Sequence, residues 1–428
     1  MTTRSEPRYK TLDAWLAWQQ TLHPRKIDLG LERVRRVFTS LHPGYQPPLT
    51  ITVGGTNGKG SCIAMLEAIL RAEGIHCGSY TSPHILRYNE RIRIAGQPLP
   101  DEAICDAFQR IDLVRAGSTL SFFEFGTLAA LDLFSQARVD VQLLEVGLGG
   151  RLDAVNIVDA DVALITSIDI DHKGWLGETR EAIGVEKAGI LRRGRPAVIG
   201  DRNPPSSLIK HAGKLETLLL RLGEDFDVRR RAGGFDWVSS SRYFEALPLP
   251  ALQGRQQMDN AATVIAALLQ LKDKLSVTET SIRQGLESIC LAGRYHSMPG
   301  RPEILLDVAH NPQAVGLLAD FIRANYPGRQ VSALFTVMAD KDVEGMLEKM
   351  GTVVDVWALA PLPDNPRCAS EQRILQAFDK LGMTPPLAGF SDWRSALAAL
   401  KNHTTEEGLV IIFGSFFLIA EFLAEHGS

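Results

Sequence analysis

The chain has 428 residues and a formal net charge of -4; 22% of its residues are charged and 45% are hydrophobic. These values are typical of a globular protein of two or three domains, and the slight acidity argues against a nucleic-acid partner. The five cysteines are scattered without a CxxC pair, which argues against a disulfide framework or a zinc site.

No targeting or membrane segment is expected. The first ten residues are polar, and the longest apolar run, residues 409–420, is broken by Gly414 and Ser415. A signal peptide needs an apolar core, and a spanning helix needs a longer apolar run. We therefore expect a soluble cytoplasmic protein.

Helical and strand patterns alternate along the chain, which predicts an α/β fold with a mostly parallel sheet. In the first part of the chain we expect helices at 12–22, 31–41, 61–71, 101–114, 122–134 and 260–271, and strands at 49–53, 78–80, 140–146, 161–168 and 195–200. The runs 140–146 and 161–168 are almost continuously apolar, as expected of central parallel strands. Residues 229–250 contain aromatic residues and serine-rich turns, which indicates an antiparallel excursion.

A second α/β unit is expected to begin near Arg294, after a joint at residues 291–302 that is rich in Gly, Pro and Arg. Its expected strands are 303–308, 331–337, 353–359 and 409–413, with helices between them, for instance at 315–326 and 392–400. The predicted domains are therefore 1–293 and 294–428.

A glycine-rich turn follows the first strand and precedes a helix, in the run Gly55-Thr56-Asn57-Gly58-Lys59-Gly60-Ser61. Backbone N–H groups of such a turn point into one concavity, where the helix N-terminus adds partial positive charge and Lys59 adds a full charge. The usual pattern is G-x-x-x-x-G-K-[ST]. Here Val53 replaces the first glycine and Gly60 separates Lys59 from Ser61, so the run is a variant phosphate loop.

Polar residues follow several of the expected strands, where ligands of open parallel sheets bind. Glu145 lies in an apolar run, and burying such a carboxylate costs free energy unless it is paired or binds a cation. The alternative is that Glu145 is a solvated residue at the edge of the sheet. His172, after what we expect to be a neighbouring strand, is either a metal ligand or an ordinary loop histidine. Ser82 is either a ligand of the same cation or a helix or turn cap. Mg²⁺ normally prefers oxygen ligands, so a histidine would be unusual.

Further candidates lie later in the chain. Lys187 could neutralise charge beside a metal and phosphates, or could be a surface lysine paired with Glu186. Asp307 and His310 lie where a strand ends and a helix opens at Pro312, a residue suited to a first helical turn.

These motifs together resemble the folylpolyglutamate synthase/dihydrofolate synthase family of the Mur-ligase superfamily, over nearly the whole chain. The most specific runs are the phosphate loop, residues 144–153 (LEVGLGGRLD), Asp171-His172, residues 186–190 (EKAGI) and residues 307–312 (DVAHNP). Residues 81–84 (TSPH) with 87–91 (RYNER) resemble the family's mobile folate-site loop, and residues 121–127 (SFFEFGT) resemble the bifunctional bacterial enzymes. The resemblance implies an N-terminal P-loop ATPase domain and a C-terminal Rossmann-like glutamate-ligase domain.

The resemblance also implies roles for individual residues. The implied nucleotide contacts are Thr56, Asn57, Gly58, Lys59, Gly60, Ser61, Asn260, Arg294, Asp307 and His310. The implied Mg²⁺ ligands are Ser82, Glu145 and His172, with Lys187 carbamylated so that it can bind a second Mg²⁺. The implied substrate contacts are Arg91, Ser121, Phe123, Asp153 and Ser415, and the groups implied to act in catalysis are Lys59, His172 and Lys187.

The implied reaction uses ATP to convert the carboxylate of dihydropteroate, or the γ-carboxylate of a folate, into an acyl phosphate that L-glutamate attacks. We expect a monomer that binds these small molecules. Two departures from the family pattern are Ala292 in place of a proline and Phe417 in place of a histidine, which leaves the role of position 417 open.

Other functions stay possible on the sequence. One is a monofunctional dihydrofolate or folylpolyglutamate synthase. Another is a cell-wall ligase of the same superfamily, which would need a UDP-binding domain before the loop, where only residues 1–54 lie. A nucleotide-driven switch is a third, and the full set of strand-end polar residues argues against it.

Overall fold

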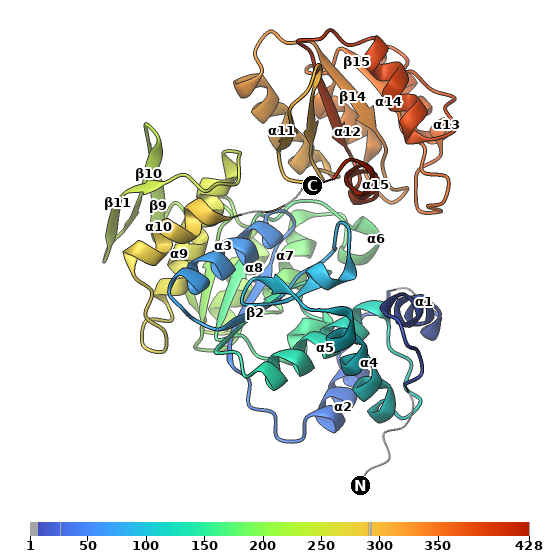
Figure 1. The fold of residues 1–428 in the computed structure, drawn as a ribbon. Helices are drawn as coiled ribbons and strands as arrows, with labels where there is room; N and C mark the ends of the chain where they lie inside the picture. Colours follow the sequence, from blue (N-terminus) through green and yellow to red (C-terminus); the bar gives the residue numbers. More distant parts are fainter. Residues whose placement is uncertain (1–6, 26, 290, 292, 428) are drawn as a thin grey trace. The chain divides into compact units, whose positions relative to one another are not determined.

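The computed structural model describes residues 7–25, 27–289, 291 and 293–427. The chain divides into two compact units, Met1–Ala251 with Met258–Ile289, and Leu252–Gln257 with Cys290–Ser428 (Figure 1). The chain thus enters the second unit before the first unit is complete. Most of the polar N-terminal segment, Cys290, and residue 292 in the predicted joint lie outside the described residues.

The first unit is built on an eight-stranded sheet with the order β4-β3-β2-β5-β1-β6-β7-β8. Its strands are β1 (Leu49–Gly54), β2 (Cys77–Tyr80), β3 (Ile92–Ile94), β4 (Gln97–Pro98), β5 (Val141–Glu145), β6 (Val162–Ile165), β7 (Pro196–Ile199) and β8 (Leu218–Arg221). Strands β2, β5, β1, β6, β7 and β8 pair in parallel, and β3 and β4 add an antiparallel edge. Strand β1 therefore lies between β5 and β6, and all three are buried apolar runs, as predicted.

Helices surround this sheet (Figure 1). They are α1 (Leu12–Leu22), α2 (Glu32–Leu41), α3 (Lys59–Ala72), α4 (Asp101–Val114), α5 (Phe122–Ala137), α6 (Lys173–Leu176), α7 (Arg180–Ala188), α8 (Ser206–Lys214), α10 (Glu279–Ser288), and all but the first two residues of α9 (Gln256–Leu269). Short 3₁₀ turns are η1 (Tyr88–Arg91) and η2 (Ala154–Ile157). Trp15 of α1 packs on Phe108 of α4 and Phe125 of α5, which joins the N-terminal helices to the core.

The predicted antiparallel excursion is a three-stranded sheet of β9 (Phe226–Arg231), β10 (Gly234–Ser239) and β11 (Tyr243–Pro248). It is attached to α9 through the buried Trp237, whose indole N–H donates a 3.0 Å hydrogen bond to the carbonyl of Ala262. The small sheet therefore supports the helix that carries Asn260.

The second unit contains a five-stranded sheet with the order β12-β13-β16-β14-β15, in which only the edge strand β12 is antiparallel. The strands are β12 (His296–Met298), β13 (Glu303–Leu306), β14 (Val331–Phe335), β15 (Val356–Leu359) and β16 (Leu409–Phe413). The helices are α11 (Pro312–Asn325), α12 (Val343–Met350), α13 (Glu371–Lys380), α14 (Trp393–Asn402) and α15 (Phe416–His426). Phe335, Trp357 and Phe413 meet in its core.

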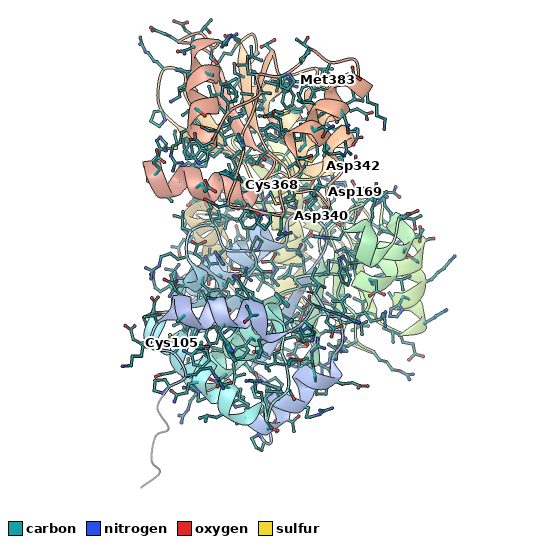
Figure 2. All side chains as sticks on the ribbon, turned by 90° about the vertical axis from the view of Figure 1, so that its right-hand side faces the viewer. Cys105, Asp169, Asp340, Asp342, Cys368 and Met383 are labelled. Atoms are coloured by element: carbon teal, nitrogen blue, oxygen red, sulfur yellow. The ribbon has the colours of Figure 1, made fainter. Side chains whose placement is uncertain are left out.

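The four cysteines within the described residues are not in disulfides. Cys62 and Cys77 are buried, while Cys105 and Cys368, which are labelled in Figure 2, are half-buried. Within the same residues, no helix combines the length and the apolar character needed to cross a bilayer.

Helices α10 and α3 approach closely at Gly285, where a Cβ atom would lie 2.6 Å from the Cα and 2.7 Å from the backbone nitrogen of Ile69. We expect Gly285→Ala to lower the free energy of unfolding by about 1–3 kcal/mol, because backbone must shift to admit the methyl group. The control is Gly213→Ala in α8, where a Cβ meets nothing within 4 Å, and which should raise stability by about 0.4–1 kcal/mol. Urea unfolding of both variants measures the difference, and equal effects would contradict the close packing.

Candidate functional site

The phosphate loop follows the carboxyl end of β1, a strand in the interior of the first unit's sheet. Because β5 and β6 flank β1, Glu145 at the end of β5 lies on one side of the loop, and the segment that follows β6 lies on the other. Ser82 follows β2, which pairs with β5. The topology thus places the predicted ligands of the metal and of the phosphates at one edge, as expected for a parallel sheet.

Two glycines of the loop are required by their surroundings. Gly55 has φ +140°, and a Cβ there would lie 1.8 Å from the hydroxyl of Thr166. Gly58 has φ +93° at the N-cap of α3, where a Cβ would lie 2.9 Å from Oδ1 of the buried Asn260. Asn260 is therefore beside the loop, although 202 positions separate the two residues in the sequence. A glycine at the N-cap offers no side chain to the first amides of α3, which suits an anion there.

The loop is also joined to the segment after β6. The backbone N–H of Thr56 donates to the carbonyl of Ser167 at 2.7 Å, and the hydroxyl of Thr56 donates to the carbonyl of Asp169 while accepting from its N–H, both at 3.0 Å. Asn57 pairs with Ser167 in a β-bridge. Thr56 and Asn57 thus fix the loop's conformation, while Gly60 and the buried Ser61 lie in the first turn of α3.

Glu145 is buried, and its Oε2 accepts a 3.1 Å hydrogen bond from the backbone N–H of Ser82. A solvated edge position for Glu145 is therefore excluded, and Ser82 does not cap a helix, since η1 begins at Tyr88. The buried carboxylate and the neighbouring serine offer oxygen donors of the kind that a hard divalent cation takes. The described residues contain no cluster of three or more His, Cys, Asp and Glu side chains able to hold a metal, so Glu145 and Ser82 alone would not complete the coordination of a cation.

His172 lies at the N-cap of α6 with φ +53°, a left-handed conformation that is uncommon for residues other than glycine. Its side chain is partly exposed, 4.0 Å from a carboxylate oxygen of Asp171. The expectation that it follows a strand next to that of Glu145 is wrong, because β1 lies between β5 and β6. The two residues are therefore on opposite sides of the phosphate loop.

Lys187 and Lys59 both donate to the carbonyl oxygen of Gly55, at 2.7 and 3.2 Å respectively. Lys187 is buried at the end of α7, and burial together with the nearby charge of Lys59 lowers its pKa to about 7. The alternative of a surface lysine paired with Glu186 is wrong, since Glu186 forms a 2.8 Å ion pair with Arg151. A buried amine that loses its proton near neutrality is thus placed against the phosphate loop.

The glycine-rich run after β5 interlocks with the end of α7. A Cβ at Gly150 would lie 2.9 Å from the carbonyl of Glu186, and a Cβ at Gly189 would lie 2.3 Å from Cβ of Arg151. Asp153 follows this run and is buried, accepting hydrogen bonds from the N–H groups of Leu148 and Val155. Burial raises the pKa of Asp153 to about 7 despite those hydrogen bonds.

Phe123 and Ser121 lie at the start of α5. The ring of Phe123 rests on Gly147, where a Cβ would be 2.6 Å from the ring. Ser121 is the N-cap of α5 and accepts from the N–H of Glu124, so its hydroxyl has a structural partner. Arg91 also reaches the start of α5, because it lies over the rings of Tyr88 and Phe122 while donating a 2.8 Å hydrogen bond to His84.

The second unit brings together its own candidates. Asp307 is buried and accepts from the N–H groups of Tyr295 and Ala309; burial raises its pKa, and the charge of Arg294 opposes the rise. His310 lies at 2.9 Å from the carbonyl of Val308 and packs edge-on against Phe416. Ser415 is buried as the N-cap of α15, and Phe417 is exposed beneath Arg367.

Some residues around the loop have no role predicted from the sequence. They are Asp169, Thr166, and the pair Arg180 and Asp201, which bonds the segment after β6. In that pair, Arg180 donates to the carbonyl of Ile168 at 2.8 Å and to Asp201 at 3.0 Å, and Asp201 accepts from the N–H of Ile168. Asp169 follows an expected strand and could have been suspected. Arg180 and Asp201 lie in unremarkable sequence and carry no such signal.

Comparison with known proteins finds relatives that match nearly the whole chain. A family model described as the glutamate ligase domain of Mur ligases matches residues 293–416. The chain is 42% identical over 417 residues to the dihydrofolate synthase/folylpolyglutamate synthase of Escherichia coli K12, a match that covers 96% of this chain and 94% of that protein. The chain belongs to the dihydrofolate synthase/folylpolyglutamate synthase family. A family member from Haemophilus influenzae is 38% identical over 432 residues, covering 96% of this chain and 97% of its own.

Solved structures of this family have the same fold. E. coli FolC in complex with DHPP and ADP is 40% identical, covers 99% of both chains and superposes with a TM-score of 0.92. A bifunctional folylpolyglutamate synthase/dihydrofolate synthase with Mn, AMPPNP and L-glutamate bound is also 40% identical, covers 98% of both chains and has a TM-score of 0.89. The family and the two-domain α/β fold class predicted from the sequence are confirmed.

The pKa of Asp153 gives a pH-dependent prediction. Its folded-state pKa of about 7 lies above the ordinary value of 3.8, so the folded state binds this proton more tightly than the unfolded state. The resulting stability is complete below pH 3.8 and is lost as the pH rises to 7. Compared with Asp153→Asn, the wild type should lose about 1.4 kcal/mol of unfolding free energy per pH unit across this window.

Urea unfolding of both proteins between pH 4.5 and 7.5 measures this loss. Because asparagine also changes the hydrogen bonds to residues 148 and 155, the slope against pH and not the offset is the readout. A difference that stays constant across the range would contradict the raised pKa.

Proposed function

We propose that this chain joins L-glutamate to dihydropteroate, forming dihydrofolate, and to the γ-carboxylate of folates, using ATP. The observation that carries the proposal is the arrangement around Gly55. A phosphate loop lies between a buried carboxylate at Glu145 and the segment after β6, with the buried Lys187 against it, in a chain whose full-length relatives carry these two synthase names.

A carboxylate is a poor acyl donor, and transfer of the γ-phosphoryl group of ATP to it gives an acyl phosphate and ADP. The amine of L-glutamate then attacks the acyl carbon, and phosphate leaves as the amide forms. Such phosphoryl transfer depends on positioning and charge neutralisation. We assign phosphate binding to residues 56–61, with Lys59 as the cation and Asn260 as a further nucleotide contact beside Gly58.

We assign a divalent cation, Mg²⁺, to the oxygen-rich edge formed by Glu145 and Ser82, with His172 as a further ligand. A relative of known structure was solved with Mn and AMPPNP, and the donor set here fits a hard cation. When bound, the metal would neutralise charge on the phosphates. We assign no coordination geometry to His172, because its segment follows β6, on the side of the phosphate loop opposite Glu145, where Arg180 bonds it.

We propose that Lys187 is carbamylated and then serves a second Mg²⁺. Carbamate formation requires a neutral amine as nucleophile, and an amine with a pKa of about 7 is substantially neutral at physiological pH. Carbamylation replaces a cation next to Lys59 with an anion, so that repulsion becomes attraction.

Substrate contacts are proposed for the remaining residues. Phe123, Ser121 and Asp153 would bind the pterin, and Arg91 would face the acidic end of the folate. In the second unit we assign nucleotide contacts to Arg294, Asp307 and His310, and a glutamate contact to Ser415. Residues 1–293 would then act as the ATPase domain and residues 294–428 as the glutamate-ligase domain, in a cytoplasmic monomer.

The first test is phosphate release from ATP with L-glutamate, offering dihydropteroate in one reaction and a reduced folate monoglutamate in another. Release with both, giving products one glutamate heavier by mass spectrometry, is the expected result. Release with one substrate alone would mean a monofunctional synthase. If folded protein released no phosphate with either substrate, the proposal would be contradicted.

The second test concerns Lys187. We expect Lys187→Ala to lower kcat by at least about 100-fold, since a charge that stabilises the transition state is lost, and we expect short carboxylates such as acetate or formate to restore part of it. Full activity without the lysine, and no response to carboxylates, would contradict the carbamate. Lys214→Ala, a change at the C-terminal end of α8, serves as the control and should leave kcat unchanged.

A further inference from the structure

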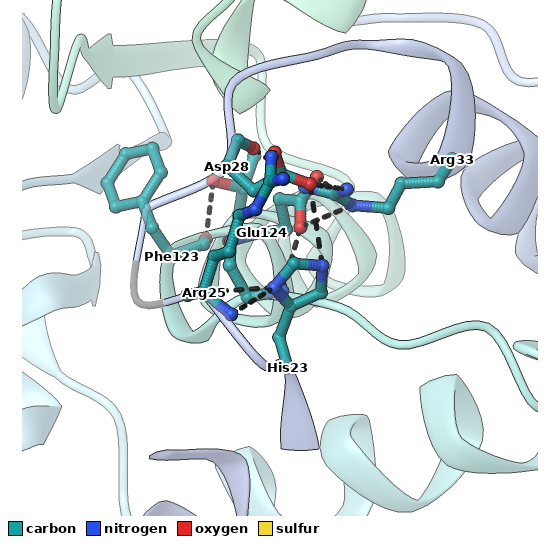
Figure 3. A network of polar contacts seen from close by, with 8 residues as sticks. His23, Arg25, Asp28, Arg33, Phe123 and Glu124 are labelled. Carbon is teal, nitrogen blue, oxygen red and sulfur yellow. Dashed lines mark hydrogen bonds and ion pairs between the residues drawn. The ribbon is translucent and has the colours of Figure 1, made fainter. Parts of the chain in front are cut away.

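A polar network joins the N-terminal helices to the start of α5, where Phe123 lies (Figure 3). It is centred on Arg33, in the first turn of α2, and reaches back to the α1–α2 connection at Asp28 and His23. None of these side chains belongs to the phosphate loop or to the proposed metal ligands.

Arg33 uses its whole guanidinium group in this network. Its Nε donates to both carboxylate oxygens of Glu124, at 2.9 and 3.0 Å. Its Nη1 donates to the carboxylate of Asp28, and its Nη2 donates to the carbonyl of Asp28 at 2.6 Å. The group thus joins a connection between two helices to a buried carboxylate 91 positions further along the chain.

Glu124 in turn fixes the first turn of α5. Its Oε2 accepts a 2.7 Å hydrogen bond from the backbone N–H of Ser121, and its own N–H donates to the Ser121 hydroxyl, which closes a capping box. Phe123 lies inside that turn. Its carbonyl accepts a 2.9 Å hydrogen bond from Thr127, and its ring rests on Gly147.

A capping box needs only Ser121 and Glu124, so the bonds from Arg33 are additional. Burying the Glu124 carboxylate with a single backbone donor would cost free energy, because the charge loses its hydration. The guanidinium of Arg33 offsets this cost by supplying the opposite charge. The guanidinium is planar and is anchored on Asp28 through Nη1 and Nη2, so the direction in which its Nε–H meets the Glu124 carboxylate is fixed, and with it the position of the turn that carries Phe123. An ammonium group could supply the charge but not a rigid plane that bonds Asp28 and Glu124 at the same time.

We infer that Arg33 is a positioning residue for the pterin part of the substrate, acting through Glu124 on Phe123. The inference rests on the proposed role of Phe123. Arg33 sets the affinity for dihydropteroate. It leaves the ATP site unchanged, because α5 does not form that site.

The test compares Arg33→Lys with a matched control, Arg110→Lys. Arg110 also donates twice to a buried carboxylate of α5, at 2.9 and 2.6 Å to Asp132, but eight residues further along the helix. Both changes keep the positive charge and remove a guanidinium that bonds a carboxylate of the same helix. The readouts are KM for dihydropteroate and for ATP, kcat, the urea midpoint, and the Kd of dihydropteroate by titration calorimetry without ATP.

For Arg33→Lys we expect KM and Kd for dihydropteroate to rise about tenfold, which corresponds to about 1.4 kcal/mol, with KM for ATP and kcat changed less than about twofold. Arg110→Lys should lower the urea midpoint to a similar extent and leave the dihydropteroate constants unchanged. Unchanged dihydropteroate constants in Arg33→Lys, or an equal rise in Arg110→Lys, would overturn the inference.

If Arg33→Lys does not fold, Glu124→Gln takes its place, because it keeps the shape and an acceptor for Ser121 while removing the charge that faces Arg33. The same rise in the dihydropteroate constants is expected, and its absence would overturn the inference. The calorimetric arm separates this inference from the proposed function. A wild type that binds dihydropteroate without turnover contradicts the function alone, whereas a wild type that does not bind it contradicts both.

Discussion

The carbonyl oxygen of Gly55 is the point on which the candidate site depends. Two amines, from Lys59 and Lys187, donate to this one oxygen, and one of them is buried. Burial disfavours the charged form of Lys187, and repulsion by Lys59 adds to this effect, so the pKa of Lys187 is lowered to about 7. The interlocked glycines after β5 and at the end of α7 hold Lys187 in this position, because any side chain at Gly150 or Gly189 would push α7 away.

Much of the fold could be predicted because its signals are local. The apolar runs of β1, β5 and β6 mark strands buried on both faces, and the phosphate loop follows from its glycines and its place between a strand and a helix. The resemblance of the motifs indicated the family. It also indicated Asn260, which no local pattern would have placed beside Gly58.

The rest depends on which distant segments meet. The sheet order separates Glu145 from His172 by one strand, and chain order alone does not reveal this because β1 is inserted between two later strands. Arg33, Arg180 and Asp201 are ordinary charged residues in the sequence, and their importance comes only from partners brought to them by the fold. The burial of Lys187 is of the same kind, since its neighbour Glu186 suggested a solvated pair.

The close packing of α10 on α3 has a consequence for how the protein is made. Helix α3, which follows the phosphate loop, leaves the ribosome early, but the helix that covers it ends at Ser288, and Asn260 also arrives late. Domains tend to fold as they emerge, yet this one lacks a covering helix until most of the chain has been synthesised. The apolar face of α3 around Ile69 is therefore exposed during translation, and a nascent chain that stalls before residue 279 would present it to chaperones.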